Sequence, residues 1–229
     1  MRDDLTQIAL ILDRSGSMSS IAGATVEGVN SFMTEQRNAP GNAALLFVQF
    51  DDLYEQVYDG GIKNAPALTL AEKPAAGEHR FEPRGWTALL DAIGTTIEDL
   101  GKRLAAMPEQ DRPGKVVVVI MTDGMENRSK QFNRDRIAQM IAQQRDVYKW
   151  QFQYLGANQD AIKEAQKFSI SADNAVTFAA TSRGAANVMR AMSSNLSSYR
   201  ISGQTASLHY SAEDRKKAVE QDDTKAAKP

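Results

Sequence analysis

A carboxylate and two hydroxyl groups stand two residues apart where the first apolar segment of the chain ends. Residues 8–12 are apolar, and Asp13, Ser15 and Ser17 follow directly. In extended backbone, residues two apart point to the same side, so these three side chains can converge. Their oxygen atoms are hard ligands, which suit Mg²⁺ or Mn²⁺ better than zinc or copper. The spacing therefore indicates a site for a hard divalent cation.

Two later segments place oxygen-bearing side chains in comparable positions. Residues 116–120 are four valines and an isoleucine, and Asp123 follows them in a Thr-Asp-Gly sequence. Thr87 stands in a Gly-Trp-Thr sequence that opens an apolar helix pattern. If the three loops meet, five side chains surround one point: Asp13, Ser15, Ser17, Thr87 and Asp123. Mg²⁺ prefers six oxygen ligands, so at least one position should remain for an outside oxygen, most naturally that of a carboxylate.

The composition excludes several other kinds of site. The 229-residue chain has no cysteine, which excludes disulfides, zinc–thiolate sites, iron–sulfur clusters and cysteine nucleophiles. Its two histidines, His79 and His209, are far apart in sequence, so a histidine-rich metal site is also excluded. With 27 basic and 29 acidic residues, the formal net charge is −2. We therefore expect no general nucleic-acid binding by a basic surface.

The chain shows no targeting or membrane signal. Its first residues, Met-Arg-Asp-Asp, carry two acids and lack the basic start and apolar stretch of a secretory signal. No apolar run approaches the roughly 20 residues that span a bilayer. We therefore expect a cytoplasmic protein without a membrane partner.

Strand and helix patterns alternate along almost the whole chain. Apolar or alternating runs predict strands at 7–12, 44–50, 53–58, 115–121, 150–155 and 175–178. Apolar stripes at helical spacing predict helices over about 21–33, 89–104, 130–147, 162–168 and 182–200. This order predicts an α/β fold, Rossmann-like, with a doubly wound, mostly parallel sheet and helices on both faces. The alternating segment 53–58 is expected to be one antiparallel edge strand.

The predicted sheet also predicts where a ligand would bind. In doubly wound sheets, ligands bind beyond the carboxyl ends of the strands, near the point where the strand order switches. Asp13 and Asp123 both follow apolar strands and so belong to that edge. We expect one domain over 1–205 and a flexible charged tail over 206–229, where little apolar sequence remains. Residues 62–84 have little periodicity and are expected to be a functional or mobile loop.

The motif residues resemble the metal-ion-dependent adhesion site of von Willebrand factor type A domains. The resemblance rests on Asp13-x-Ser15-x-Ser17, the distant Thr87, and Asp123 in its Thr-Asp-Gly turn, and it covers about residues 5–200. Residues 83–92 are also similar to the bacterial intracellular branch of that family. The resemblance implies that Ser15 and Ser17 bind the ion directly. It implies that Thr87 and Asp123 bind directly or through water, and that Asp13 acts mostly through water.

Two functions remain open at this stage. The favoured one is a non-catalytic protein-binding module in which Mg²⁺ or Mn²⁺ accepts an Asp or Glu side chain from a partner protein. The resemblance adds a candidate for that partner, an ATPase or another subunit of a bacterial assembly. The alternative is a Mg²⁺-dependent phosphoryl hydrolase with Asp13 as nucleophile. Against it, Ser15 stands where a second carboxylate would serve as acid or base. A structural alternative is that Asp13 and the serines only cap the first helix.

The residues around the motif allow more than one interpretation. Arg14, Arg84 and Arg128 lie on the three site loops, one on each. They either form local ion pairs, or make a positive rim that steers an acidic ligand. Trp86 is expected to pack into the core, with contact to a partner as the alternative. The acidic pair at 51–52 is expected to be exposed.

Overall fold

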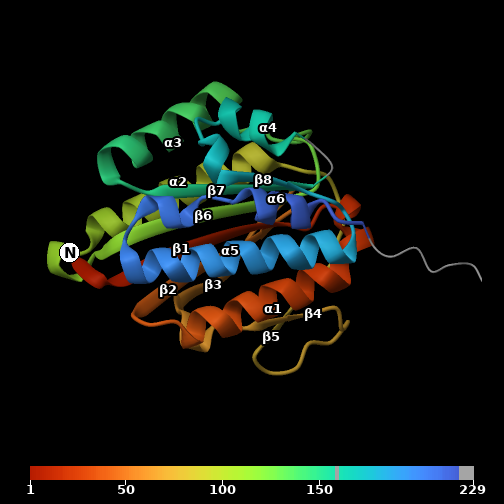
Figure 1. Cartoon of the computed structure of the whole chain (residues 1–229), viewed down its shortest axis with the longest axis horizontal. Coiled ribbons are helices and arrows are strands. Elements are labelled where there is room, and N and C mark those ends of the chain that lie inside the picture. Colours follow the sequence, from red (N-terminus) through yellow and green to blue (C-terminus); the bar gives the residue numbers. More distant parts are fainter. Residues whose placement is uncertain (158–159, 222–229) are drawn as a thin grey trace, which may run out of the picture.

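A six-stranded sheet forms the centre of the protein in a computed structural model that describes residues 1–157 and 160–221 (Figure 1). The strands are β1 (Arg2–Asp13), β2 (Asn42–Phe50), β3 (Tyr54–Gly61), β6 (Pro113–Thr122), β7 (Gln151–Ala157) and β8 (Ala175–Phe178). Their order is β3-β2-β1-β6-β7-β8, and every pair is parallel except β2 with β3. The predicted mostly parallel sheet with one antiparallel edge strand is confirmed.

Helices cover both faces of this sheet (Figure 1). The helices α1 (Ala22–Asn38) and α5 (Ser182–Ser202) pack on one face. The other face is covered by α2 (Leu89–Ala106), α3 (Arg134–Tyr148) and α4 (Ala161–Lys167). A short helix, α6 (Ala212–Ala218), packs against α5 and β8. The chain is therefore doubly wound, as its alternating patterns predict.

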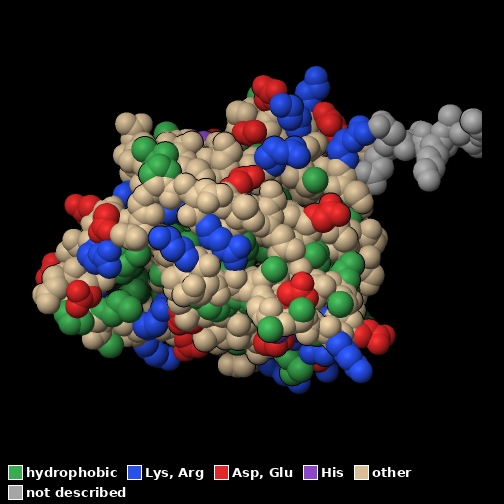
Figure 2. All heavy atoms as spheres, turned by 90° about the horizontal axis from the view of Figure 1, so that it is seen from below, with side chains coloured by type: hydrophobic (Ala, Val, Ile, Leu, Met, Phe, Trp, Pro, Cys, Tyr) green, Lys and Arg blue, Asp and Glu red, His purple; other side chains and the backbone are tan. Residues whose placement is uncertain are grey.

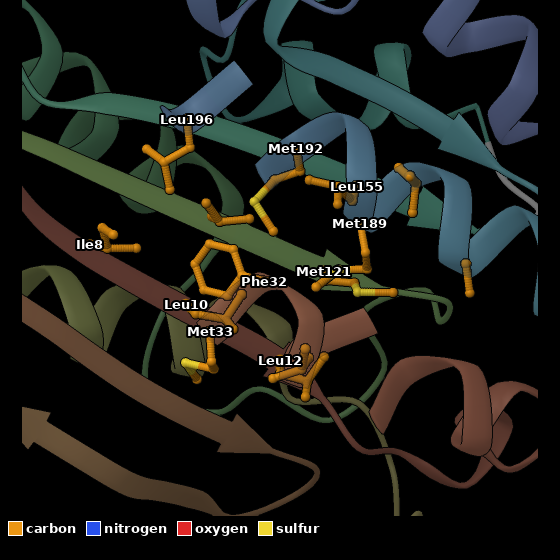
Figure 3. Packing of buried hydrophobic residues seen from close by; sticks show 14 of the residues in the cluster. Ile8, Leu10, Leu12, Phe32, Met33, Met121, Leu155, Met189, Met192 and Leu196 are labelled. Carbon is orange, nitrogen blue, oxygen red and sulfur yellow. The ribbon is translucent and has the colours of Figure 1, made fainter. Parts of the chain in front are cut away.

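The apolar run of β1 is buried on both sides because helices cover both faces. Ile8, Leu10 and Leu12 point toward α1 and α5, where Figure 3 shows them among side chains of those helices. Ala9 and Ile11 belong to the cluster on the opposite face. This two-sided burial holds β1 at the middle of the sheet, and its last residue is Asp13.

The helix that follows Thr87 is amphipathic in the predicted way. Its buried stripe contains Leu89, Ile93, Ile97, Leu100 and Leu104, which pack against the face of the sheet that α3 also covers. Burial of this stripe fixes the start of α2 beside the carboxyl end of β1 and β6.

Residues 62–84 contain more structure than a loop. They form a 3₁₀ turn, η2 (Ile62–Asn64), and two short parallel strands, β4 (Ala67–Thr69) and β5 (Glu78–Arg80). Leu68 and Phe81 are buried in the core on the α1 side. The side chain of Asn30 on α1 bonds both the N–H and the C=O of Leu68, at 2.7 and 2.9 Å. Two buried apolar residues and the hydrogen bonds of Asn30 thus hold this segment against α1, although its sequence has little periodicity.

The packed domain ends later than the predicted boundary at 205. A 3₁₀ turn, η5 (Thr205–Leu208), and the helix α6 lie within the predicted tail 206–229. Leu208 and Tyr210 are buried in the core, and the guanidinium of Arg215 donates to the carbonyl of Ala175 on β8 at 2.6 Å. The described part of the predicted tail, residues 206–221, is therefore packed against the domain. Residues 222–229, the rest of that predicted tail, lie outside the described residues.

The surface carries charges of both signs. Figure 2 shows Lys and Arg side chains interspersed with Asp and Glu on the face seen from below, without a broad area of one sign. Among the helices of the described residues, none is long and apolar enough to span a membrane.

Candidate metal centre

The three predicted loops meet at one edge of the sheet. Asp13 ends β1, and Asp123 directly follows the last residue of β6, which is the neighbour of β1 in the sheet. Thr87 lies two residues before α2 begins. From β1 the chain winds outward through β2 in one direction and from β6 through β7 in the other. The loops therefore lie at the switch point of the sheet, where doubly wound folds bind ligands.

Hydrogen bonds and short contacts join four of the five predicted residues, and the fifth, Thr87, lies beside the same turn. The backbone N–H of Ser15 donates to Asp13 Oδ1 at 2.6 Å, and Ser15 Oγ lies 3.1 Å from Ser17 Oγ. Ser17 Oγ donates to Asp123 Oδ1 at 2.6 Å. A methyl group built on Gly124 would lie 2.8 Å from Thr87 Oγ1 and 3.6 Å from Ser17 Oγ. The structure thus brings all five predicted residues together around one small volume.

The five residues differ in burial. Asp13, Ser15 and Thr87 are buried and form the floor of the site. Asp123 is partly exposed and Ser17 is exposed. Oxygen atoms on the open side are therefore accessible to a ligand from outside, while those on the floor are shielded from water.

Burial disfavours the charged forms of both carboxylates. It raises the pKa of Asp13 to about 6, although hydrogen bonds from Thr122 and Ser15 act in the opposite direction. Burial also raises the pKa of Asp123, against the hydrogen bond from Ser17. The hydrogen bonds that reach these two groups come from hydroxyl and backbone N–H groups. A divalent cation would supply the positive charge that favours both ionised forms.

The donor set fits a hard cation. Three hydroxyl groups and two carboxylates are the oxygen ligands that suit Mg²⁺ or Mn²⁺. Within residues 1–157 and 160–221, no group of three or more His, Cys, Asp or Glu side chains is placed to hold a metal ion. A metal centre at this edge would therefore depend on its hydroxyl groups.

Helix capping does not account for the serines. A 3₁₀ turn, η1 (Gly16–Ile21), precedes α1, whose N-cap is Ile21 and which has no side-chain cap. Ser15 is the N-cap of η1, but its side chain makes no capping hydrogen bond. The hydroxyls of Ser15 and Ser17 instead face each other, and the hydroxyl of Ser17 donates to Asp123.

Thr122 belongs to the site, although the sequence reasoning missed it. Its Oγ1 donates to Asp13 Oδ2 at 2.6 Å, and it accepts the N–H of Gly124 at 3.2 Å. Thr122 is fully buried, so this hydrogen bond fixes the orientation of the Asp13 carboxylate. Its position directly before Asp123 is the only signal in the sequence that points to it.

A second set of missed residues pins the loop after β6 to the start of α2. Asn127 Oδ1 accepts the N–H of Thr87 at 2.9 Å, and the N–H of Asn127 donates to the C=O of Thr87 at 3.1 Å. Glu126 accepts the N–H of Leu90 at 2.9 Å. Helix α2 has no side-chain cap at its own N-cap residue, Ala88, so this loop satisfies N–H groups that would otherwise lack partners.

Asp91 fixes the same loop from the helix side. Its two carboxylate oxygens accept three consecutive backbone N–H groups, those of residues 130–132, at 2.8 to 2.9 Å. Together with Asn127 and Glu126, it holds Thr87 and Asp123 in a fixed relation. The sequence does not predict these roles, because each of them depends on the loop after β6 lying beside the start of α2.

Of the two interpretations of the arginines, a positive rim is wrong for Arg14 and local ion pairing is correct. This side chain is buried and forms ion pairs with Asp51, at 3.1 Å, and with Glu55. The half-exposed Arg84 also pairs with Asp51, at 2.9 Å. Asp51 is only 1% exposed, so the expectation of an exposed acid is wrong for it as well. The reason is that Asp51 follows β2 at the same sheet edge, between the first and second site loops.

Trp86 does not pack into the core. Its side chain is 62% exposed. Gly85 before it has φ +65°, and a Cβ at this position would clash with Asp52 Oδ1. This turn of the backbone leaves Thr87 buried and Trp86 outside.

The chain matches no protein-family model and no curated protein. Solved structures with a similar fold include the pilus adhesin SpaC from Lactobacillus rhamnosus GG, with a TM-score of 0.59 and 15% identity. That match covers 86% of this chain and 30% of SpaC. A von Willebrand factor type A protein from Catenulispora acidiphila has a TM-score of 0.55 and 16% identity, covering 82% of this chain and 41% of that one.

A third similar structure is proximal thread matrix protein 1 from the mussel byssus, solved with a zinc-occupied MIDAS motif. Its TM-score is 0.52 at 16% identity, and the match covers 81% of this chain and 44% of that protein. This chain thus spans less than half the length of each of these structures. At such low identity the likeness concerns the fold, and it agrees with the sheet order and the helices on both faces. The chain has the fold of a von Willebrand factor type A domain.

Proposed function

We propose that this protein is a non-catalytic protein-binding module whose metal centre accepts an Asp or Glu side chain from a partner protein. The ion would be held by Asp13, Ser15, Ser17, Thr87 and Asp123. The observation that supports this most strongly is the convergence of three hydroxyls and two carboxylates from three separate loops. When bound, the ion would offer a coordination position to an outside carboxylate oxygen.

Different groups of the protein hold the different ligand residues of this centre. Thr122 and the N–H of Ser15 hold the two oxygens of Asp13. Asn127 holds the backbone of Thr87 on both sides of its peptide unit. Ser17 and Asp123 lie on the accessible side, where a partner would approach. A site prepared in this way needs little reordering when a ligand binds.

The donor chemistry favours Mg²⁺ or Mn²⁺ as the ion. The similar byssus protein is described with zinc in its MIDAS motif. In this chain the donors are hydroxyls and carboxylates, without the cysteine or histidine ligands that zinc often takes. We further propose a cytoplasmic setting and, as partner, an ATPase or another subunit of a bacterial assembly, on the resemblance of residues 83–92.

Phosphoryl hydrolysis has weaker support. A nucleophilic Asp13 would need an accessible oxygen, but this residue is fully buried. Both of its oxygens accept hydrogen bonds, from Thr122 and from the N–H of Ser15. In the sequence, Ser15 occupies the position at which a second carboxylate would serve as general acid or base.

The test of the proposal is partner capture under metal control. Immobilised protein is incubated with bacterial lysate in Mg²⁺ or in EDTA, alongside the Asp123→Ala variant and an Asp173→Ala control at an exposed acid on a distant turn. We expect partners that are retained in Mg²⁺ by the native protein and the control, and lost with EDTA or Asp123→Ala. If neither EDTA nor Asp123→Ala reduces the amount of partner retained, metal-dependent binding is refuted.

A further inference from the structure

Large apolar side chains are exposed around the metal centre. Trp86 is 62% exposed, Met125 is 65% exposed and Leu53 is 60% exposed. Trp86 precedes Thr87, and Met125 follows the Asp123-Gly124 pair. Exposed tryptophan and methionine are enriched in the contact surfaces of protein complexes. We call these three residues the apolar rim.

The backbone contacts place the rim residues beside the same opening. The N–H of Trp86 donates to Asp52 Oδ1 at 3.4 Å, and Leu53 is the next residue of the chain. Gly124, next to Met125, lies so close to Thr87 that a methyl group on it would be 2.8 Å from Thr87 Oγ1. A hollow of about 60 Å³ is lined by Leu53 and Ala88 together with the acids Asp51, Asp52 and Asp91.

The rim is held by a constrained backbone. Trp86 stands between Gly85, at φ +65°, and Thr87, whose N–H and C=O are both bonded by Asn127. The backbone on both sides of Trp86 is therefore constrained, which lowers the entropy lost when a ligand binds there.

The charges around the rim are of both signs. Asp51 is neutralised by Arg14 and Arg84, while Glu126 is occupied by backbone N–H groups. Arg128, three residues beyond Met125, is exposed. Asp52, between Asp51 and Leu53, is also exposed, and it accepts the N–H of Trp86 at 3.4 Å. A carboxylate that approaches the metal centre therefore meets charges of both signs at the rim, and the bound ion would supply the main attraction.

We propose that the apolar rim receives a large apolar residue next to the partner's acidic residue, so that the recognised segment combines Glu or Asp with an adjacent aromatic or large aliphatic side chain. This inference rests on the proposed function, since the carboxylate must first be held at the ion. An aromatic ring adds contact area on Trp86 and prefers offset or edge-to-face packing against it. The rim thus determines which acidic segments bind, while the ion supplies the common anchor.

Three blocked pentapeptides separate these contributions. The probe Gly-Phe-Glu-Phe-Gly carries both features, Gly-Ala-Glu-Ala-Gly lacks the aromatic rings, and Gly-Phe-Gln-Phe-Gly lacks the charge. Binding to the full chain is followed by NMR in saturating Mg²⁺ and again in EDTA, with the indole N–H signal of Trp86 identified by its loss in Trp86→Phe. The variants are Trp86→Ala, Met125→Ser and the control Ile201→Ala, an equally exposed apolar residue near the opposite edge of the sheet.

We expect the Phe-Glu-Phe peptide to bind about 10-fold tighter than Ala-Glu-Ala, which corresponds to about 1.4 kcal/mol. It should shift the Trp86 indole signal only in Mg²⁺, and Phe-Gln-Phe should not bind. Trp86→Ala should bring the ratio close to one while Ala-Glu-Ala binds unchanged, Met125→Ser should lower the ratio, and Ile201→Ala should leave it as it is.

Each contrary result has a distinct meaning. Equal binding of the two Glu peptides, or an unchanged ratio in Trp86→Ala, would overturn the rim and leave the metal-dependent capture of acids standing. Failure of both Glu peptides to bind in Mg²⁺ would overturn the proposed function and the rim together. Self-association of the chain that Trp86→Ala abolishes would show the rim to be a contact between two copies, and would also overturn the proposal.

Discussion

Among the single residues of the metal centre, Thr87 offers the clearest test, because its hydroxyl can be removed or kept by small changes. Its backbone is bonded by Asn127 and does not depend on the side chain. Thr87→Ala should therefore keep the fold but weaken Mn²⁺ binding at least about 10-fold, whereas Thr87→Ser should retain it. Calorimetric titration with MnCl₂ measures both. Equal affinities of the Ala and Ser variants would mean that this hydroxyl is not a ligand.

The ligand residues could be predicted because their signal is local. Asp13, Ser15 and Ser17 are close in sequence, and their types alone indicate a hard cation. The roles of Thr122 and Asn127 could not be predicted in this way, because each acts on a residue of another loop. Whether a side chain such as Trp86 is exposed depends in the same way on how neighbouring segments meet.

Asp51 shows why charged residues near a motif are hard to interpret from sequence. Two adjacent acids at 51–52 are typical of a solvated turn, yet Asp51 accepts hydrogen bonds from Arg14, Arg84 and the N–H of Leu53. Its own C=O also accepts the N–H of Ala88 at the start of α2. The residue therefore joins all the segments around the first two site loops, a role that only the folded arrangement reveals.

At the level of elements, those with a clear apolar pattern followed from the sequence, while three short elements without one did not. The strand 175–178 was predicted with its bounds, and β6 to within two residues. By contrast, β4, β5 and α6 have three to seven residues and are stabilised by a few contacts to distant parts of the chain. Periodicity over so few residues carries little information.

The hydrogen bonds that join the loop after β6 to the start of α2, which we call the latch, can be tested with Asn127→Ala. This change removes the acceptor of the Thr87 N–H and should lower the free energy of unfolding by about 1 kcal/mol, as loss of a helix cap does. It should also weaken Mn²⁺ binding, because Thr87 is no longer held. The matched control is Asn133→Ala, which removes the N-cap of α3 at a site without a ligand role.

Urea unfolding of the metal-free proteins and Mn²⁺ titration separate the two effects. Both variants should lose similar stability, and only Asn127→Ala should lose metal affinity. A similar loss of affinity in Asn133→Ala, or none in either variant, would show that the latch does not position the centre.

The later end of the domain gives a prediction for the C-terminal elements. A chain that stops at residue 204 loses Leu208, Tyr210 and α6, and it exposes the apolar surface on α5 that they cover. Burial of each large side chain contributes roughly 1.5–3 kcal/mol, so this truncation should lower the free energy of unfolding by several kcal/mol. A chain that stops at 221 keeps these elements and should be more stable than the shorter chain by that amount. Equal stability of the two truncated chains in urea would restore the boundary at 205.

At the level of the whole molecule, the ion should couple the three loops to global stability. A ligand that binds only the folded state stabilises it by about 2.7 kcal/mol at a concentration 100 times its Kd. For a chain of this size, each kcal/mol raises the Tm by roughly 2–4 °C. Saturating Mg²⁺ should therefore raise the Tm by roughly 5–10 °C, measured by calorimetry against an EDTA sample.

The variant Ser15→Ala serves as the reference for that shift. Its melting temperature should hardly respond to Mg²⁺, because one buried ligand oxygen is missing. An equal rise in the native protein and in the variant would instead indicate a general salt effect or a different binding site.

The location of a bound ion tests the central claim most directly. Crystals grown with MnCl₂ and measured at the manganese absorption edge give an anomalous difference map that shows the ion alone. The account predicts one strong peak between the hydroxyls of Ser15, Ser17 and Thr87 and the carboxylate of Asp123. A map with no peak among these residues, or with its main peak elsewhere on the chain, would contradict it.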